Sequence, residues 1–132
     1  PDDRDLQTLN PLFPRGNYFT EASLLGPQNF IDLHPCLRLQ PTERWAVDLG
    51  FDFYWRQSLD DGIYTPGGTA IYGGDPDLAR FVGTDLSLTI GWQATRNLSI
   101  STSFTHFFAG KFIRQNGGKD VNFGALSMSY RF

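Results

Sequence analysis

The sequence predicts an all-β protein, a strip of antiparallel strands from the wall of an up-and-down transmembrane β-barrel. Apolar and polar residues alternate with a period of two over segments of about 10 to 13 residues, longer than the usual strand of a globular protein. Aromatic residues make up 15% of the chain and gather at the ends of these segments. The two lysines, Lys111 and Lys119, both lie outside the alternating segments. Long strands with one apolar face and one polar face that lacks lysine are typical of barrels that cross a bilayer.

The clearest alternation runs over residues 44–56. One face of this segment is entirely apolar, whereas Asp48, Asp52 and Arg56 lie on the opposite face. Pro35, in an earlier segment, lacks an amide donor and therefore predicts a local bulge or a position near a strand start. The alternation as a whole predicts these strands: Ile31–Gln40, Arg44–Arg56, Val82–Ala94, Leu98–Phe108 and Val121–Phe132.

Tight turns and long loops alternate along the chain. The turns are residues 41–43 and 95–97, and the long loops are 57–80, 110–120 and a loop end at 1–29. In bacterial barrels, long loops lie outside the cell and tight turns lie in the periplasm. Five strands are too few to close such a barrel, because the smallest of this class have about eight. We therefore expect residues 1–132 to be the C-terminal part of one barrel domain whose remaining strands lie elsewhere.

The positions of the aromatic residues separate a membrane barrel from a soluble β-sandwich, which shows the same alternation. Trp45 and Trp55 stand at the two ends of one apolar face, spaced to cover about 25 Å of membrane height at barrel tilt. Indole and phenol rings favour the headgroup layer, where one edge is wet and the other apolar. These residues are expected at the membrane interface: Trp45, Trp55, Trp92, Phe108, Tyr130 and Phe132. The alternative is a soluble β-sandwich binding module.

Several functional classes lack support in the sequence. The net charge of −3 does not indicate a nucleic-acid partner, which would need a basic stripe. Cys36 is the single cysteine, so neither an internal disulfide nor a thiolate cluster is expected. His34 and His106 fall on different strands and opposite faces, and no nucleophile–base set or phosphate loop is present. We expect no catalytic residue, metal or cofactor here; an outer-membrane enzyme with its site outside this chain is a further alternative.

Several long segments resemble the alginate export family of outer-membrane proteins. They are residues 10–19 (NPLFPRGNYF), 26–35 (GPQNFIDLHP), 105–113 (THFFAGKFI) and 117–123 (GGKDVNF). The alternating residues that end in Tyr130 and Phe132 resemble the C-terminal signal read by the barrel-assembly machinery of the bacterial outer membrane. The resemblance covers nearly the whole chain. It implies an 18-stranded monomeric barrel that passes an anionic polysaccharide to the cell exterior.

Charged residues on the polar face are the candidates for contact with such a solute, because guanidinium groups in a narrow pore attract and orient carboxylates. The lumen candidates are Arg38, Arg56, Arg131, Asp48, Asp52 and Asp85, and the basic residues expected at the pore mouth are Lys111, Arg114 and Lys119. The aspartates of residues 44–56 are placed to pair with Arg38 across the ladder. Acidic groups on this face are as numerous as basic ones. From the resemblance and the basic candidates together, we expect a channel for export or diffusion of an anionic polysaccharide or a related solute.

Overall fold

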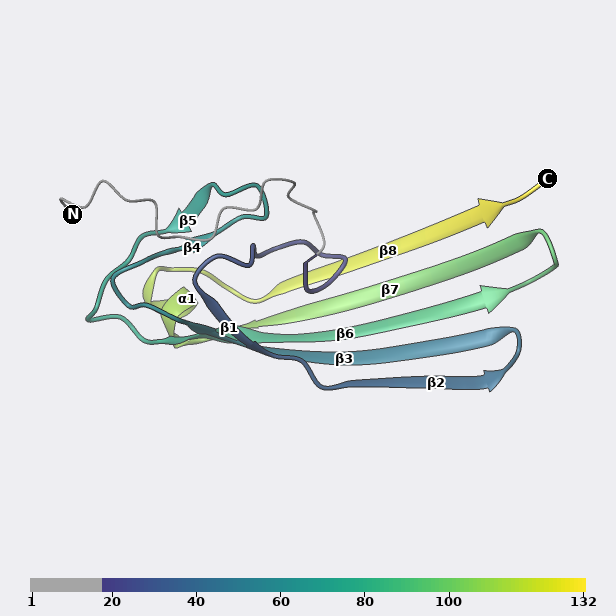
Figure 1. Cartoon of the computed structure of the whole chain (residues 1–132), viewed down its shortest axis with the longest axis horizontal. Coiled ribbons are helices and arrows are strands. Elements are labelled where there is room, and N and C mark those ends of the chain that lie inside the picture. Colours follow the sequence, from purple (N-terminus) through teal and green to yellow (C-terminus); the bar gives the residue numbers. More distant parts are fainter. Residues whose placement is uncertain (1–17) are drawn as a thin grey trace.

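The computed structural model describes residues 18–132, and long antiparallel strands dominate it (Figure 1). The main sheet consists of β1 (Phe30–Leu33), β2 (Cys36–Thr42), β3 (Trp45–Arg56), β6 (Phe81–Gln93), β7 (Leu98–Ala109) and β8 (Val121–Tyr130). A separate hairpin pairs β4 (Ile63–Tyr64) with β5 (Ala70–Tyr72), and the helix α1 (Lys111–Gln115) lies in the loop before β8.

The main sheet runs up and down in sequence order. β3 pairs with β6, β6 with β7 and β7 with β8, while β1 and β2 both lie along the other edge of β3. This confirms the predicted all-β, antiparallel fold class. The described strands do not close into a barrel, since β1 and β2 form one edge of the sheet and β8 forms the other. Among the described residues, no helix is long and apolar enough to cross a membrane.

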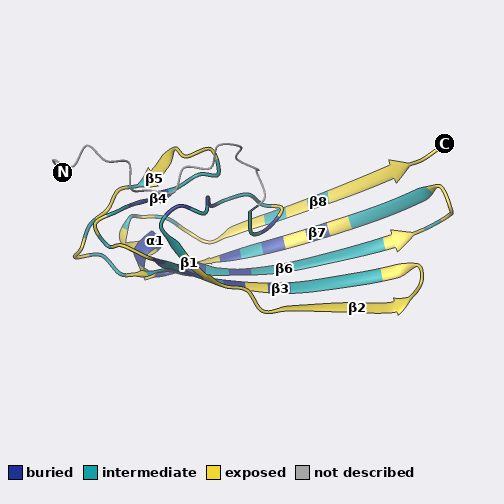
Figure 2. Cartoon of the chain, viewed as in Figure 1, coloured by how far each residue is buried: buried dark blue, intermediate teal, exposed yellow. Residues whose placement is uncertain are grey.

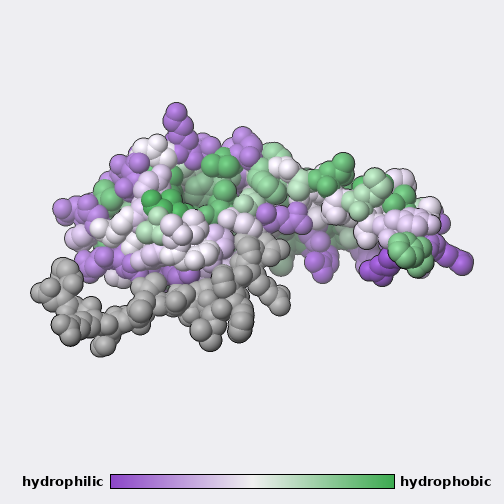
Figure 3. Space-filling view, turned by 90° about the horizontal axis from the view of Figure 1, so that it is seen from above, coloured by the Kyte–Doolittle hydropathy of each residue, from purple (hydrophilic) through white to green (hydrophobic). Residues whose placement is uncertain are grey.

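The register sorts side chains onto two contrasting faces. We call one the outer face; it carries Leu37, Leu39, Val47, Leu49, Phe51, Leu86, Leu88, Ile90, Ile100, Phe104, Leu126 and Met128. The other, the inner face, carries Arg38, Asp48, Asp52, Asp85, Ser87, Thr89, Ser101, Ser103, Thr105 and Ser127. On the outer face Leu126 and Met128 are 76% and 69% exposed. Figure 3 shows hydrophobic side chains along one side of the strand-rich half and hydrophilic ones projecting from the other.

The predicted first strand is interrupted at Pro35, between β1 and β2. The pairing register on β3 nevertheless continues from β1 to β2 without an extra residue. Of the two alternatives predicted for Pro35, the structure gives a position at a strand start, since β2 begins at Cys36; the register shift lies between Leu39 and Thr42 instead. The Pro35 carbonyl accepts a hydrogen bond from the Phe51 amide at 3.0 Å, so the ladder loses only the donor that proline lacks.

The loops gather over one end of the sheet, which we call the loop end (Figure 1). The hairpin β4–β5, the helix α1 and residues 18–29 all lie there, and buried residues concentrate in the same region (Figure 2). They form a small hydrophobic core over the inner face, the loop-end core: Leu25, Tyr54, Ile63, Val82, Phe107, Ala109, Phe112 and Ile113. Toward the opposite end, which carries the tight turns, the inner face is polar.

Candidate functional site

The inner face beyond the loop-end core carries a groove along β2, β3 and β6. It is lined by His34, Cys36, Leu37, Arg38, Asp48, Leu49, Gly50, Ser87 and Thr89. A second hollow lies beside it, where Phe19, Thr20 and Glu21 approach the polar residues of β6 and β7. Alternation places these hydroxyl, carboxyl and guanidinium groups on one side of the sheet. The groove therefore offers both hydrogen-bond donors and acceptors to a polar solute.

Arg38 and Asp48 are directly opposite each other on β2 and β3, and their side chains form an ion pair. The predicted cross-strand pairing of Arg38 is confirmed for Asp48. The Arg38 side chain is 79% exposed and that of Asp48 39% exposed, so both remain accessible from the groove. A water-facing pair of this kind contributes little stability. Its charges are available to a solute instead.

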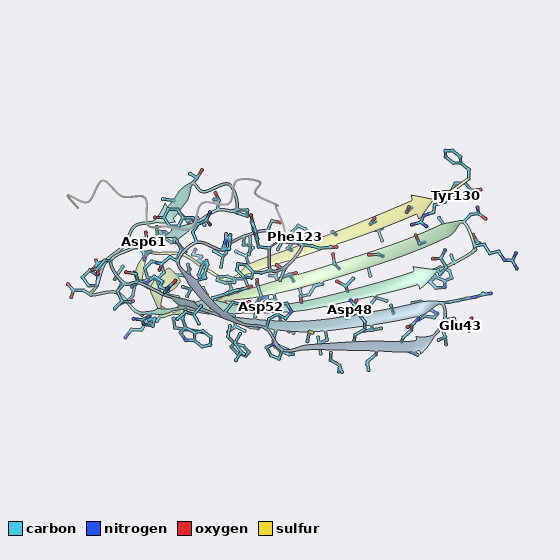
Figure 4. The ribbon with its side chains drawn as sticks, in the orientation of Figure 1. Glu43, Asp48, Asp52, Asp61, Phe123 and Tyr130 are labelled. Atoms are coloured by element: carbon cyan, nitrogen blue, oxygen red, sulfur yellow. The ribbon has the colours of Figure 1, made fainter. Side chains whose placement is uncertain are left out.

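Asp52 and Asp85 lie deeper on the inner face and face each other across β3 and β6. Both carboxylates are almost fully buried, and the Tyr54 hydroxyl donates to Asp85 at 3.1 Å. His34 Nδ1 lies 2.5 Å from the Asp52 carboxylate. Figure 4 shows Asp48 and Asp52 on the same strand, with Asp52 nearer the loop end. Of the predicted lumen aspartates, Asp48 is thus accessible and the other two are covered.

Arg56 occupies a different place from the one expected of a lumen residue. It is fully buried, and its guanidinium stacks on the Phe112 ring at 4.1 Å from the ring centroid. Its donors point at main-chain carbonyls of the long loop, those of Leu59, Asp75, Leu78 and Ala79, at 2.8–3.2 Å. Arg56 is buried beneath the loop and does not line the groove. Its hydrogen bonds hold the loop on the sheet. Periodicity identified its face but not the loop that covers it.

The basic residues expected at the pore mouth lie in and after α1, at the loop end. Lys111, Arg114 and Lys119 are all exposed. Arg114 donates to both oxygens of Asp120 at 2.8 and 3.2 Å and to the Ala109 carbonyl at 2.9 Å. The Ala109 amide and then the Arg114 guanidinium hold the pKa of Asp120 below its ordinary value. Arg114 is therefore partly engaged in shaping the loop, while Arg131 is exposed at the opposite end of the sheet.

The predicted interface aromatics flank the outer face. At the turn end Trp45 and Trp92 stack with ring centroids 5.5 Å apart, and Tyr130 is 64% exposed nearby on β8. At the loop end Trp55 contacts Phe81, and Phe108 lies beside His106. Phe132, which follows β8, is exposed. The predicted interface aromatics are thus divided between the two ends of the strands.

A short segment of the chain covers part of the inner face, which the sequence did not predict. The Phe19 ring packs edge-on against Tyr54, and Glu21 accepts a hydrogen bond from the Ser103 hydroxyl on β7. Leu25 joins the loop-end core. The described part of this segment thus folds over the inner face rather than away from it. Only part of the expected loop end at 1–29 falls within the described residues.

A comparison with known protein families matches residues 1–126 to the alginate export family. No curated protein and no solved structure matched the chain. The match agrees with the segments noted in the sequence and with the antiparallel sheet. The family consists of outer-membrane β-barrel proteins with an export-type transport function. With nearly its whole length matched, this chain belongs to the alginate export family.

Proposed function

We propose that the described sheet is one wall of a closed outer-membrane barrel that passes an anionic polysaccharide or a related solute. In this proposal, residues 1–132 form the C-terminal part of one barrel domain, with loops 57–80 and 110–120 outside the cell. The single observation that carries it is the contrast between the two faces of one sheet. Exposed leucines, Met128 and Phe104 cover the outer face, as contact with lipid requires. The inner face carries hydroxyl and charged groups suited to a water-filled passage.

The aromatic residues at the strand ends support the same orientation. Trp45 and Trp92 would lie in the inner headgroup layer, and Trp55 and Phe108 in the outer one. The alternate apolar residues that end in Phe132 would serve as the signal for barrel assembly. Missing strands would pair with the free edges of β2 and β8, because unpaired backbone groups are costly in lipid.

Within the passage, Arg38 is the basic side chain of the groove that is best placed to meet a carboxylate of the solute. It is largely exposed, and its partner Asp48 sets how much of its charge is available. Lys111 and Lys119, exposed at the loop end, would attract the same polyanion at the mouth. The half-buried hydroxyls of Ser87 and Thr89 on β6 and of Ser99 and Ser101 on β7 would hydrogen-bond sugar hydroxyls without binding them tightly.

Ion selectivity of the complete protein in planar bilayers tests the proposal. R38Q removes a positive charge from the groove, so the reversal potential in a salt gradient should shift toward cation selectivity. D48N removes the paired negative charge and should shift it the opposite way. R96Q, in the turn between β6 and β7, is the matched control and should leave the potential unchanged. A protein that conducts no ions, or variants whose potentials move together, would overturn the proposal.

A further inference from the structure

The geometry points to a binding site for a divalent transition-metal ion, Zn²⁺ or a close relative, formed by Asp32, His34 and Asp52. This goes beyond the transport function and does not depend on it. One ligand atom from each of the three side chains can be chosen so that all lie within 4.8 Å of one another. Ligands on one zinc ion at about 2.0–2.1 Å stand roughly 3–3.5 Å apart, so small side-chain rotations are sufficient.

Strand pairing brings the three residues together. Asp32 and His34 are alternate residues along the first edge of the sheet, so both project onto the inner face. The continuous register across Pro35 places His34 opposite Asp52, and His34 Nδ1 lies 2.5 Å from its carboxylate. A Cβ at Gly50 would stand 2.7 Å from Ser87 Oγ and 3.3 Å from His34 Nε2, so the glycine leaves space for both side chains. The imidazole ring of His34 therefore lies beside Gly50 and the Asp52 carboxylate of β3.

A second observation indicates that a cation belongs at this place. Asp52 has no exposed surface, and its Oδ2 has no hydrogen-bond partner among the described residues. Asp85, directly opposite and 2% exposed, has one carboxylate oxygen, Oδ1, in the same condition. Two neighbouring buried carboxylates with unpartnered oxygens are costly unless a positive charge or hydrogen bonds compensate them. A divalent ion bound between Asp52, Asp32 and His34 would supply that positive charge.

The ligand set favours a first-row transition ion over calcium or magnesium. Ca²⁺ and Mg²⁺ take oxygen ligands, whereas imidazole suits Zn²⁺, Cu²⁺, Ni²⁺ and Fe²⁺. Asp32 and His34 are both exposed on the side of the groove, so an ion has access and keeps room for a water molecule. The ion would tie β1 to β3 beside Pro35, where the ladder lacks one hydrogen bond. It would also reduce the negative charge of this part of the inner face.

Metal binding to the complete, tag-free barrel protein in detergent micelles tests the site. After treatment with a chelator, the protein is titrated with Zn²⁺ by calorimetry, and bound zinc is counted by mass spectrometry of the elements. We expect one equivalent of Zn²⁺ that excess Ca²⁺ and Mg²⁺ do not displace. Because Asp52 is fully buried, D52N would also change the packing around it, so the two exposed ligands give the decisive variants: H34Q and D32N should each weaken Zn²⁺ binding at least about tenfold.

Two matched controls separate this site from casual binding. H106Q removes the other histidine, which lies on the opposite face with Asn122, and should bind zinc like the unmodified protein. D48N removes an inner-face aspartate outside the cluster and should also leave the affinity unchanged. The inference is overturned if the unmodified protein binds no zinc, because protons or internal hydrogen bonds then satisfy the carboxylates. It is equally overturned if H34Q binds zinc as tightly. Neither outcome depends on conductance, so the proposed channel is judged separately.

Discussion

Arg56 makes a sharp test of how the long loop is held on the sheet. Its guanidinium donates to four loop carbonyls and stacks on Phe112. Replacement by methionine keeps most of the apolar stem but leaves those carbonyls without their donor. Each lost partner costs about 1–3 kcal/mol when the carbonyl stays buried. Since the loop can relax and admit water, we take the low end of this range, about 4 kcal/mol in total.

A loss of about 4 kcal/mol increases the open population of residues 57–80 roughly a thousandfold, because each 1.4 kcal/mol is a factor of ten. Chymotrypsin cleavage of the complete protein in micelles measures this population, provided that the loop closes faster than it is cut. Cleavage after Tyr64 or Tyr72 should therefore accelerate by that factor in R56M. The acceleration cannot exceed the factor that corresponds to the free energy of opening this loop in the unmodified protein, because at that point the loop is fully open.

Two further variants complete the experiment. R56K keeps the positive charge but has fewer donors in fixed directions, so its cleavage rate should fall between those of R56M and the unmodified protein. R38M removes an exposed arginine whose side chain forms an ion pair with Asp48, away from the long loop, and it should leave loop cleavage unchanged. If R56M resists chymotrypsin as well as the unmodified protein does, the loop is held by its apolar contacts and the reasoning fails.

Two other predictions concern the outer face and the loop before β8. L88K should destabilise the complete barrel in lipid vesicles by about 2–4 kcal/mol, whereas T89K, on the inner face, should cost under about 1 kcal/mol. Urea unfolding compares them, and equal losses would contradict the assignment of faces. The Ala109 amide is the first of the groups that depress the Asp120 pKa, so this carboxylate stabilises the loop above its unfolded pKa of about 3.8. Hydrogen-exchange protection of the loop should fall as the pH drops below that value, and D120N should remove this dependence; an unchanged pH profile in D120N would contradict it.

The strands were predictable from sequence because each residue of this sheet meets one of two contrasting surroundings. Over β3, β6, β7 and β8 the alternation of apolar and polar side chains fixed both the strand and its orientation. The turn at residues 95–97 followed from the same pattern. Local sequence sufficed because the signal at each residue depends on which side its own side chain faces.

Long-range pairing decided the features that the sequence left open. Which loop covers Arg56 depends on carbonyls 19 to 23 residues away, and Glu21 meets Ser103 across 82 positions. His34 was compared with His106, although the register gives it Asp52 as a neighbour. At Pro35 the sequence left a bulge and a strand start open, and the pairing with β3 decided for the strand start. None of these relations leaves a periodic trace in the chain.

The loop-end core gives the inner face two different characters along a single strand. On β3, Asp48 looks into the groove, whereas Tyr54, on the same side of the strand, is sealed among apolar side chains. In the proposed channel, a substitution near the turns would therefore alter ion conductance, whereas one near the loops would alter the stability of the folded sheet. Surveys of tolerated changes should divide at about Asp52, with conductance responding on one side and yield of assembled protein on the other.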